Sequence, residues 1–314
     1  MINRPFLALI GPTASGKTAV SLLLAKSLGG EIVSVDSRQI YKYLDIGTAK
    51  PSEADRASVL HHFVDLFEPT VEYSAGQYGM DCRKTLTAIQ RGGSTPVLVG
   101  GSGLYLKAAI DGLGDVPDAK REIREELEEE VKRLGLAHLI EELRVVDAET
   151  LNAMTQVNAR RVIRALEIYR TSGIPLSQLH DKQERGRPLD ILQIGLRWNR
   201  ADLHHRINDR VDQMILRGLV DETRRLLSRG FSRRLNSFNT VGYKEVCEYL
   251  EGKITHDTMV EAIKRNTRRF AKRQMTWFKA DKRIQWVDVF PSSDFEDIAA
   301  TIERIFRKTP ASAG

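Results

Sequence analysis

A glycine-rich run near the N-terminus constrains this chain more than any other feature. The run, Gly11-Pro-Thr-Ala-Ser-Gly-Lys-Thr18, follows the apolar stretch Phe6–Ile10 and precedes a segment, 18–26, with a helical pattern. A buried strand that turns through glycines into a helix directs backbone N–H groups and the positive end of the helix dipole at one point. Lys17 adds a positive charge, and Thr18 adds a hydroxyl for Mg²⁺. The sequence therefore predicts a phosphate-binding loop (P-loop) that holds a di- or triphosphate.

The rest of the chain alternates short apolar runs with helical patterns, which is typical of a mostly parallel sheet with helices on both faces. We therefore expect an α/β, P-loop NTPase-like fold with strands at Phe6–Ile10, Glu31–Val35, Phe63–Leu66, Pro96–Val99, Ile191–Leu196 and Gln285–Val289. After the fifth strand, a helical pattern is expected from Asp202, as its cap, to Leu227.

Strand signals are absent between about 115 and 188, where the pattern predicts only helices. These are expected over Ala119–Leu134, His138–Leu143 and Asn158–Thr171, the last closed by Gly173. The chain is thus predicted to form an α/β domain from residues 1–114 and 189–314, with an inserted helical domain at 115–188.

Basic charge is concentrated in one segment near the C-terminal end. The net charge is +6, and residues 264–279 contain seven Lys and Arg residues with no Asp or Glu. Ile263, Phe270, Trp277 and Phe278 recur near helical spacing, which predicts a helix with an apolar stripe packed on the core. A solvated face is one interpretation of the remaining cations. Their mutual repulsion favours an anionic partner, and we expect nucleic acid.

Other features exclude several classes of protein. Gly11 and Pro12 interrupt the first apolar stretch, so no signal peptide or membrane span is expected, and we predict a cytoplasmic protein. Cys82 and Cys247 are far apart and are predicted to be ordinary buried or half-buried thiols. His61 and His62 have no nearby third ligand, so packing or capping roles are favoured over a metal site. No obligate protein partner is evident.

The carboxyl ends of parallel strands are where ligands bind in open α/β sheets. The second strand ends at Asp36, and the fourth runs into Gly100-Gly-Ser-Gly-Leu-Tyr105. Asp36 could be a magnesium ligand, a general base or a helix cap. Gly100 and Gly101 would allow a ligand to approach the backbone, and Ser102 could hydrogen-bond a substrate.

Together, these motifs resemble the bacterial tRNA dimethylallyltransferases, also called tRNA isopentenyltransferases. The resemblance covers nearly the whole chain. Each motif alone is weak, but the complete set in this order argues against coincidence. It rests on the P-loop and on Asp36-Ser-Arg-Gln-Ile-Tyr41, Asp45-Ile-Gly-Thr-Ala-Lys-Pro51, His61-His-Phe-Val-Asp65, Gly100-Gly-Ser-Gly-Leu-Tyr105, Arg164-Ala-Leu-Glu167, Gly242-Tyr-Lys-Glu245 and Ala271-Lys-Arg-Gln-Met-Thr-Trp-Phe278.

The resemblance implies transfer of a dimethylallyl group from its diphosphate to the exocyclic N6 amine of the adenine that follows the anticodon in certain tRNAs. Asp36 would be the general base, and Ser102, the second residue implied to be catalytic, would stand near the reacting groups where the family commonly has threonine. Mg²⁺ would be bound by Thr18, alone or with Asp36. The P-loop residues implied to bind diphosphate are Gly11, Pro12, Thr13, Ala14, Ser15, Gly16, Lys17 and Thr18.

The partner implied by the resemblance is the anticodon stem-loop of tRNA. At the turn before Arg160–Arg164, Val157-Asn158 stands where the family often has Asn-Asp. The residues implied to face tRNA are Asp36, Ser37, Arg38, Gln39, Ser102, Arg124, Arg160, Arg161, Val162, Ile163, Arg164, Thr240, Val241, Gly242, Tyr243, Lys244 and Glu245.

Two other functions remain open from the residues. A kinase of nucleotides or small metabolites also uses a P-loop under a helical lid. A tRNA-binding module could carry the loop as a structural element. A P-loop also suggests nucleotide binding, ATP included, although no residue requires ATP hydrolysis. Because the basic charge lies on one long helix and near Arg160–Arg164, the sequence favours nucleic acid over the kinase.

Overall fold

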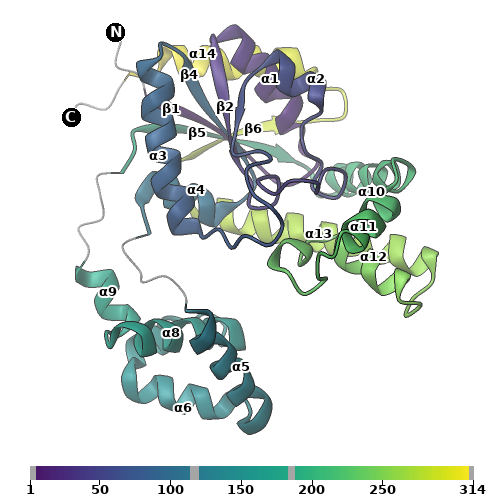
Figure 1. Ribbon diagram of the computed structural model, residues 1–314. Helices are drawn as coiled ribbons and strands as arrows, with labels where there is room; N and C mark the ends of the chain where they lie inside the picture. Colours follow the sequence, from purple (N-terminus) through teal and green to yellow (C-terminus); the bar gives the residue numbers. More distant parts are fainter. Residues whose placement is uncertain (1–4, 114–119, 183–187, 311–314) are drawn as a thin grey trace. The chain divides into compact units, whose positions relative to one another are not determined.

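A computed structural model of the chain describes residues 5–113, 120–182 and 188–310. These residues divide into two compact units (Figure 1). Unit 1 is built from the two segments 1–110 and 189–314, and unit 2 is the segment 111–188 between them. The predicted boundary at 114 and 115 lies outside the described residues.

A parallel sheet forms the centre of unit 1, as the sequence predicts. Its order is β3-β2-β4-β1-β5-β6, and every neighbouring pair is parallel. The central strand, β1, pairs with β4 through Leu7↔Val97 and with β5 through Phe6↔Ile191. The strands are β1 (Phe6–Ile10), β2 (Gly30–Val35), β3 (His61–His62), β4 (Thr95–Gly100), β5 (Ile191–Trp198) and β6 (Ile284–Val289).

Helices cover both faces of this sheet (Figure 1). Alternate residues of a strand point to opposite faces, so Leu7 and Leu9 join one core, with α1 and α14, whereas Ala8 and Ile10 join the other, with α3, α4 and α13. The helices of unit 1 are α1 (Lys17–Ser27), α2 (Glu53–Ser58), α3 (Ala75–Arg91), α4 (Gly103–Asp111), α10 (Arg200–Leu216), α11 (Leu219–Ser228), the 3₁₀ helix η1 (Asn236–Phe238), α12 (Tyr243–Leu250), α13 (His256–Ala280) and α14 (Phe295–Lys308).

Two predicted elements of unit 1 are wrong in detail. The third strand was expected at Phe63–Leu66, but pairing ends at His62 because Phe63 and Asp65 take positive φ values of 61° and 56° and turn the chain out of the sheet. The helix expected from Asp202 to Leu227 is two helices. Asn199 caps α10 by accepting the N–H of Asp202 at 2.9 Å, and Gly218, with φ 93°, separates α10 from α11.

Unit 2 is helical, as predicted, and has its own hydrophobic core. Asn158 caps α8 by accepting the N–H of Arg161 at 3.2 Å, and Gly173 ends it in the left-handed conformation. The core is formed by Leu127, Leu139, Leu143, Leu151, Val162, Ile163, Ala165 and Leu166. The helices of unit 2 are α5 (Arg121–Leu134), α6 (Leu136–Val146), α7 (Ala148–Ala153), α8 (Ala159–Ser172) and α9 (Leu176–Lys182).

The basic segment lies within the long helix α13, which confirms the predicted helix. Ile263 and Phe278 are buried as expected, with exposed fractions of 1% each. The expectation that Phe270 and Trp277 also pack on the core is wrong, because their side chains are 38% and 47% exposed. No helix among the described residues is long and apolar enough to cross a membrane.

Candidate active site

The P-loop connects β1 to α1 and has the predicted strand–loop–helix geometry. Gly16 has a φ of 91°, and a Cβ built on it would lie 2.6 Å from Cζ of Phe295, so only glycine fits there. The first intrahelical bond of α1 runs from the Val20 N–H to the Gly16 carbonyl. The N–H groups that precede it have no partner within the helix and can bind an anion.

Three distant side chains fix the backbone of the P-loop. Gln274 of α13 accepts the N–H of Thr13 at 2.9 Å. The Trp198 indole N–H donates to the Ser15 carbonyl at 3.0 Å, and Arg206 Nε donates to the Ala14 carbonyl at 2.9 Å. The loop is therefore held in shape before any ligand arrives, which reduces the conformational cost of binding.

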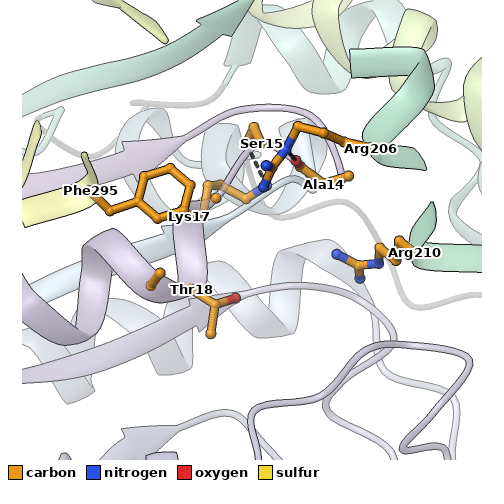
Figure 2. Close-up of a pocket in the computed structure, with 9 residues that line it drawn as sticks. Ala14, Ser15, Lys17, Thr18, Arg206, Arg210 and Phe295 are labelled. Carbon is orange, nitrogen blue, oxygen red and sulfur yellow. Dashed lines mark hydrogen bonds between the residues drawn. The ribbon is translucent and has the colours of Figure 1, made fainter. Parts of the chain in front are cut away.

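A pocket of about 280 Å³ opens at this loop (Figure 2). Its lining consists of residues 14–19 together with Arg206, Arg210 and Phe295. Figure 2 shows the two arginines reaching the pocket from α10. Lys17 Nζ donates to the Pro12 carbonyl at 2.6 Å and lies 3.5 Å from Ser15 Oγ. The pocket therefore combines three basic side chains with free backbone donors, which suits a polyphosphate.

The charges in the pocket are poorly compensated by the protein itself. Burial, together with the nearby Arg210, lowers the pKa of Lys17 to about 7, and Asp36 opposes this shift. Burial also lowers the pKa of Arg210, against the attraction of Asp36. A bound anion would relieve this repulsion and restore a charged Lys17.

Asp36 and Ser102 follow neighbouring strands, β2 and β4, and lie at the same edge of the sheet as the P-loop. Asp36 Oδ1 accepts the N–H of Arg38 at 2.8 Å and that of Gln39 at 3.3 Å. Ser102 Oγ accepts the N–H of Ser37 at 3.1 Å. The structure thus brings together the two residues that the sequence predicted to be catalytic, and Asp36 also caps the turn that follows it.

The chain matches a family model described as IPP transferase over residues 39–281. It belongs to the IPP transferase family. A second model, isopentenyl transferase, matches residues 5–72. The tRNA dimethylallyltransferase of Pelotomaculum thermopropionicum is 43% identical over 307 residues and 96% of each chain. The enzyme of the same name from Thermotoga maritima is 44% identical over 297 residues and 94% of each chain.

Solved structures of similar proteins support this membership. The full-length tRNA isopentenylpyrophosphate transferase of Bacillus halodurans is 38% identical, with a TM-score of 0.70 over 98% of both chains. A eukaryotic dimethylallyltransferase acting on tRNA has a TM-score of 0.82 over 99% of this chain and 81% of its own. At 24% identity, that match supports the fold alone.

Two of the residues expected to face tRNA in this IPP transferase are buried in the turn before α12. Tyr243 is 0% exposed and donates its hydroxyl to Glu222 Oε1 at 2.5 Å. Glu245 is 4% exposed, accepts the Gly242 N–H at 2.8 Å and binds Asn266 Nδ2 at 2.7 Å. Their side chains hold the turn instead of forming its surface, so the expectation that these two side chains face tRNA is wrong, whereas contact of the rest of the turn with RNA stays a prediction. Gly242 is buried too, Thr240 and Val241 are half-buried, and Lys244 is exposed.

A similar correction applies within unit 2. Val162 and Ile163 were expected to face tRNA, but they are 0% and 8% exposed and belong to the core of this unit. Arg160 and Arg161 are exposed at the start of α8. Buried Glu167 binds Arg124 at 3.2 Å and Arg164 at 3.1 Å.

The glycines after β4 serve the protein's own packing. A Cβ on Gly100 would lie 2.0 Å from the Val35 carbonyl oxygen, and one on Gly101 would lie 2.2 Å from Gln274 Nε2. Protein atoms thus occupy the space that a side chain would need at either position, and close approach of a ligand to this backbone stays a prediction. Ser37, Arg38 and Gln39 are half-buried beside Asp36.

Sequence reasoning missed Arg206, Arg210, Gln274 and Phe295. The two arginines are four residues apart, which places them on one face of a helix, but an ordinary amphipathic helix has the same spacing. The other predicted features are accounted for by local contacts. His62 binds Glu31 at 2.7 Å, and both cysteines are free and buried, as predicted.

Proposed function

We propose that this protein is a tRNA dimethylallyltransferase. It transfers the dimethylallyl group of dimethylallyl diphosphate to the N6 amine of the adenine 3′-adjacent to the anticodon and releases diphosphate. The observation that carries the proposal is membership of the IPP transferase family. Relatives named tRNA dimethylallyltransferase match this chain over almost their whole length. The kinase alternative is not favoured by any of these relatives.

The P-loop pocket suits the leaving group of this reaction. As the bond between C1 and the diphosphate oxygen breaks, the electron pair leaves with the oxygen, and negative charge grows on the diphosphate. Lys17, Arg206 and Arg210 surround the pocket, so they would stabilise that charge where it develops. The free N–H groups at the start of α1 would add fixed donors at the same place.

Asp36 suits the acceptor side. The adenine amine is a weak nucleophile because its lone pair is delocalised into the ring, and it becomes acidic as the new N–C1 bond forms. Asp36 would accept the proton that N6 loses. Ser102, bound to the Ser37 N–H, would orient the amine or the carboxylate. The target base would have to leave its stack to enter such a site.

The Thr18 hydroxyl would be a ligand for Mg²⁺ beside the diphosphate. Its side chain is exposed at the start of α1, and its hydroxyl has no hydrogen-bond partner among the described residues. Mg²⁺ prefers oxygen ligands and is often held by few protein groups together with substrate phosphates. When bound, the ion would neutralise part of the leaving group's charge.

The proposed function includes a location. Because its substrate would be tRNA, we expect the protein to act in the cytoplasm.

The test is transfer of label from dimethylallyl diphosphate to unmodified tRNA by the purified protein. We expect labelled tRNA and an equal amount of free diphosphate, both dependent on the adenine after the anticodon. A parallel reaction with γ-labelled ATP and candidate acceptors tests the kinase. Unlabelled tRNA together with a phosphorylated product would reject the proposal, and so would RNA binding without diphosphate release.

A further inference from the structure

An exposed strip of side chains runs along α13 beside the candidate active site. It consists of Phe270, Arg273 and Trp277, and we call it the α13 strip. Residues three, four and seven apart lie on one side of a helix, so these three side chains are neighbours. The Arg273 guanidinium carbon lies 5.8 Å from the centre of the Phe270 ring. The strip thus presents two aromatic rings and one planar cation to the outside of the protein.

Trp277 connects this strip to the loop that contains Ser102. A Cβ built on Gly103, the next residue, would lie 2.2 Å from Trp277 Cδ1 and 2.3 Å from Nε1. The indole is therefore seated against the backbone of Gly103, where any other residue would displace it. Since 47% of the Trp277 side chain remains exposed, a planar group has room to cover it.

The charge around the strip indicates the kind of partner that would cover it. Within the described residues, no carboxylate pairs with the exposed cations of this helix, which are Arg265, Arg269, Lys272, Arg273 and Lys279. By contrast, the half-buried Lys264 binds Asp212 at 2.8 Å. Aromatic rings among unpaired cations are typical of surfaces that bind single-stranded nucleic acid, because bases stack on the rings while phosphates meet the charges.

We infer that Trp277 stacks on an unpaired base of the RNA loop, next to the base that enters the site. Phe270 and Arg273 would contact the base that follows the stacked one. From residue 270 to residue 277 the helix rises roughly 10 Å, which is enough for a few stacked bases. This inference rests on the proposed function, because it assumes that the loop at Ser102 receives an RNA base. It adds a site for a second base and names the side chain that binds it.

The test combines protein variants with RNA loops that lack one base. Binding of an unmodified anticodon stem-loop, and of loops with a single abasic position, is measured for the wild-type protein, Trp277→Leu and Trp277→Phe. Leucine keeps an apolar side chain but removes the π face. We expect Trp277→Leu to weaken binding of the intact loop roughly tenfold to a hundredfold, and Trp277→Phe to retain most of the affinity.

The decisive result is a coupling between the protein and one RNA position. We expect one abasic position to weaken the wild-type protein but to leave Trp277→Leu unaffected. Phe290→Leu, which changes another exposed aromatic side chain, and Arg304→Ala, which removes an exposed cation of α14, should leave that coupling unchanged. Equal affinity of Trp277→Leu and wild type would overturn the inference, and so would an equal loss at every abasic position.

The two proposals fail in different ways. If the wild-type protein transfers no dimethylallyl group to tRNA, the proposed function is wrong whatever Trp277 does. If the wild-type protein transfers the group and Trp277→Leu has the same affinity for the stem-loop and the same KM for tRNA, only the stacking inference is wrong. An unchanged melting temperature of Trp277→Leu shows that this comparison is made on folded protein. Melting of each variant also separates a lost contact from a lost fold.

Discussion

At the scale of single residues, Asp36 has two tasks that substitution can separate. One carboxylate oxygen caps the following turn through the N–H groups of Arg38 and Gln39. The charge of the same carboxylate favours the protonated forms of Lys17 and Arg210 in the P-loop pocket. An asparagine keeps an oxygen for the cap but has neither the charge nor the basicity, whereas an alanine removes both.

We therefore predict that Asp36→Asn lowers the rate of transfer by about a hundredfold or more, which is the usual contribution of a general base. Its melting temperature should stay near that of the wild type, and its affinity for the RNA stem-loop should change little. Asp36→Ala should lose about 1 kcal/mol of folding stability as well, because the turn loses its cap. Single-turnover kinetics and thermal melting measure these effects. Near-normal transfer by Asp36→Asn would reject the role of general base.

Lys17 predicts a pH dependence for diphosphate binding. Its pKa of about 7 lies far below the ordinary value for lysine, so above pH 7 the free protein holds a mostly neutral amine. A bound diphosphate favours the charged form, and binding must then take up a proton. The binding constant should fall as pH rises above 7, with a slope approaching about one logarithmic unit per pH unit, and this contribution should vanish below pH 7.

Calorimetry of diphosphate binding between pH 6 and pH 9 checks this dependence. Lys17→Met serves as the matched control, because it keeps a long unbranched side chain without the amine. Any pH dependence that it retains comes from the titration of the ligand and of other groups. The difference between the two proteins isolates the lysine. Identical pH profiles would show that Lys17 binds without changing its protonation.

The role of a residue could be predicted from the sequence where a local pattern places the residue in the site. Lys17 and Asp36 could be found because a short motif or the end of a strand places them. Arg210 could not, because its helix arrives at the P-loop only through the tertiary fold. The buried position of Tyr243 was missed for the same reason, since its partner Glu222 comes from another helix.

At the scale of elements, α13 links the two halves of the candidate site. Gln274, 8% exposed, accepts the Thr13 N–H at 2.9 Å and donates to the Gly101 carbonyl at 3.0 Å. One amide therefore joins the loop for the diphosphate to the loop that contains Ser102. The Thr13 N–H can only donate and the Gly101 carbonyl can only accept, so these two backbone groups fix the orientation of the Gln274 amide.

Variants of Gln274 should lose both stability and turnover. Gln274→Met leaves both backbone groups without partners, whereas Gln274→Glu keeps an acceptor for the Thr13 N–H but places a carboxylate oxygen against the Gly101 carbonyl. We expect a loss of about 1–3 kcal/mol for methionine and a larger loss for glutamate. The kcat for transfer should fall in both, while the affinity for the RNA stem-loop stays constant because Gln274 is buried. Denaturant unfolding and steady-state kinetics measure this, and normal kcat in a folded Gln274→Met protein would contradict the linking role.

The elements themselves were predictable where pattern and packing agree. The β1 strand was found with its correct bounds, because an apolar run next to a P-loop has few alternatives. The Phe63–Leu66 strand failed because apolar side chains also line a turn that leaves the sheet. Along α13, spacing alone could not tell which apolar residues face the core, so Trp277 was misplaced.

At the scale of the whole molecule, the chain contains two separate sets of hydrophobic contacts. The core of unit 2 is built from its own residues, whereas unit 1 draws its cores from both of its segments. The absence of strand signals between about 115 and 188 already indicated an inserted helical region. Its proposed part in tRNA binding stays a prediction, because no contact described within unit 2 identifies RNA as its ligand.

We predict that the two units can be destabilised independently. Leu166 is 0% exposed in the core of unit 2, so Leu166→Ala should cost about 2–5 kcal/mol there. Hydrogen exchange should accelerate in residues 120–182 while the sheet of unit 1 and its diphosphate affinity keep their wild-type values. Leu9→Ala, the same change in the 0% exposed core of β1, should do the reverse and weaken diphosphate binding. Faster exchange throughout the chain in both variants would show that the units unfold together.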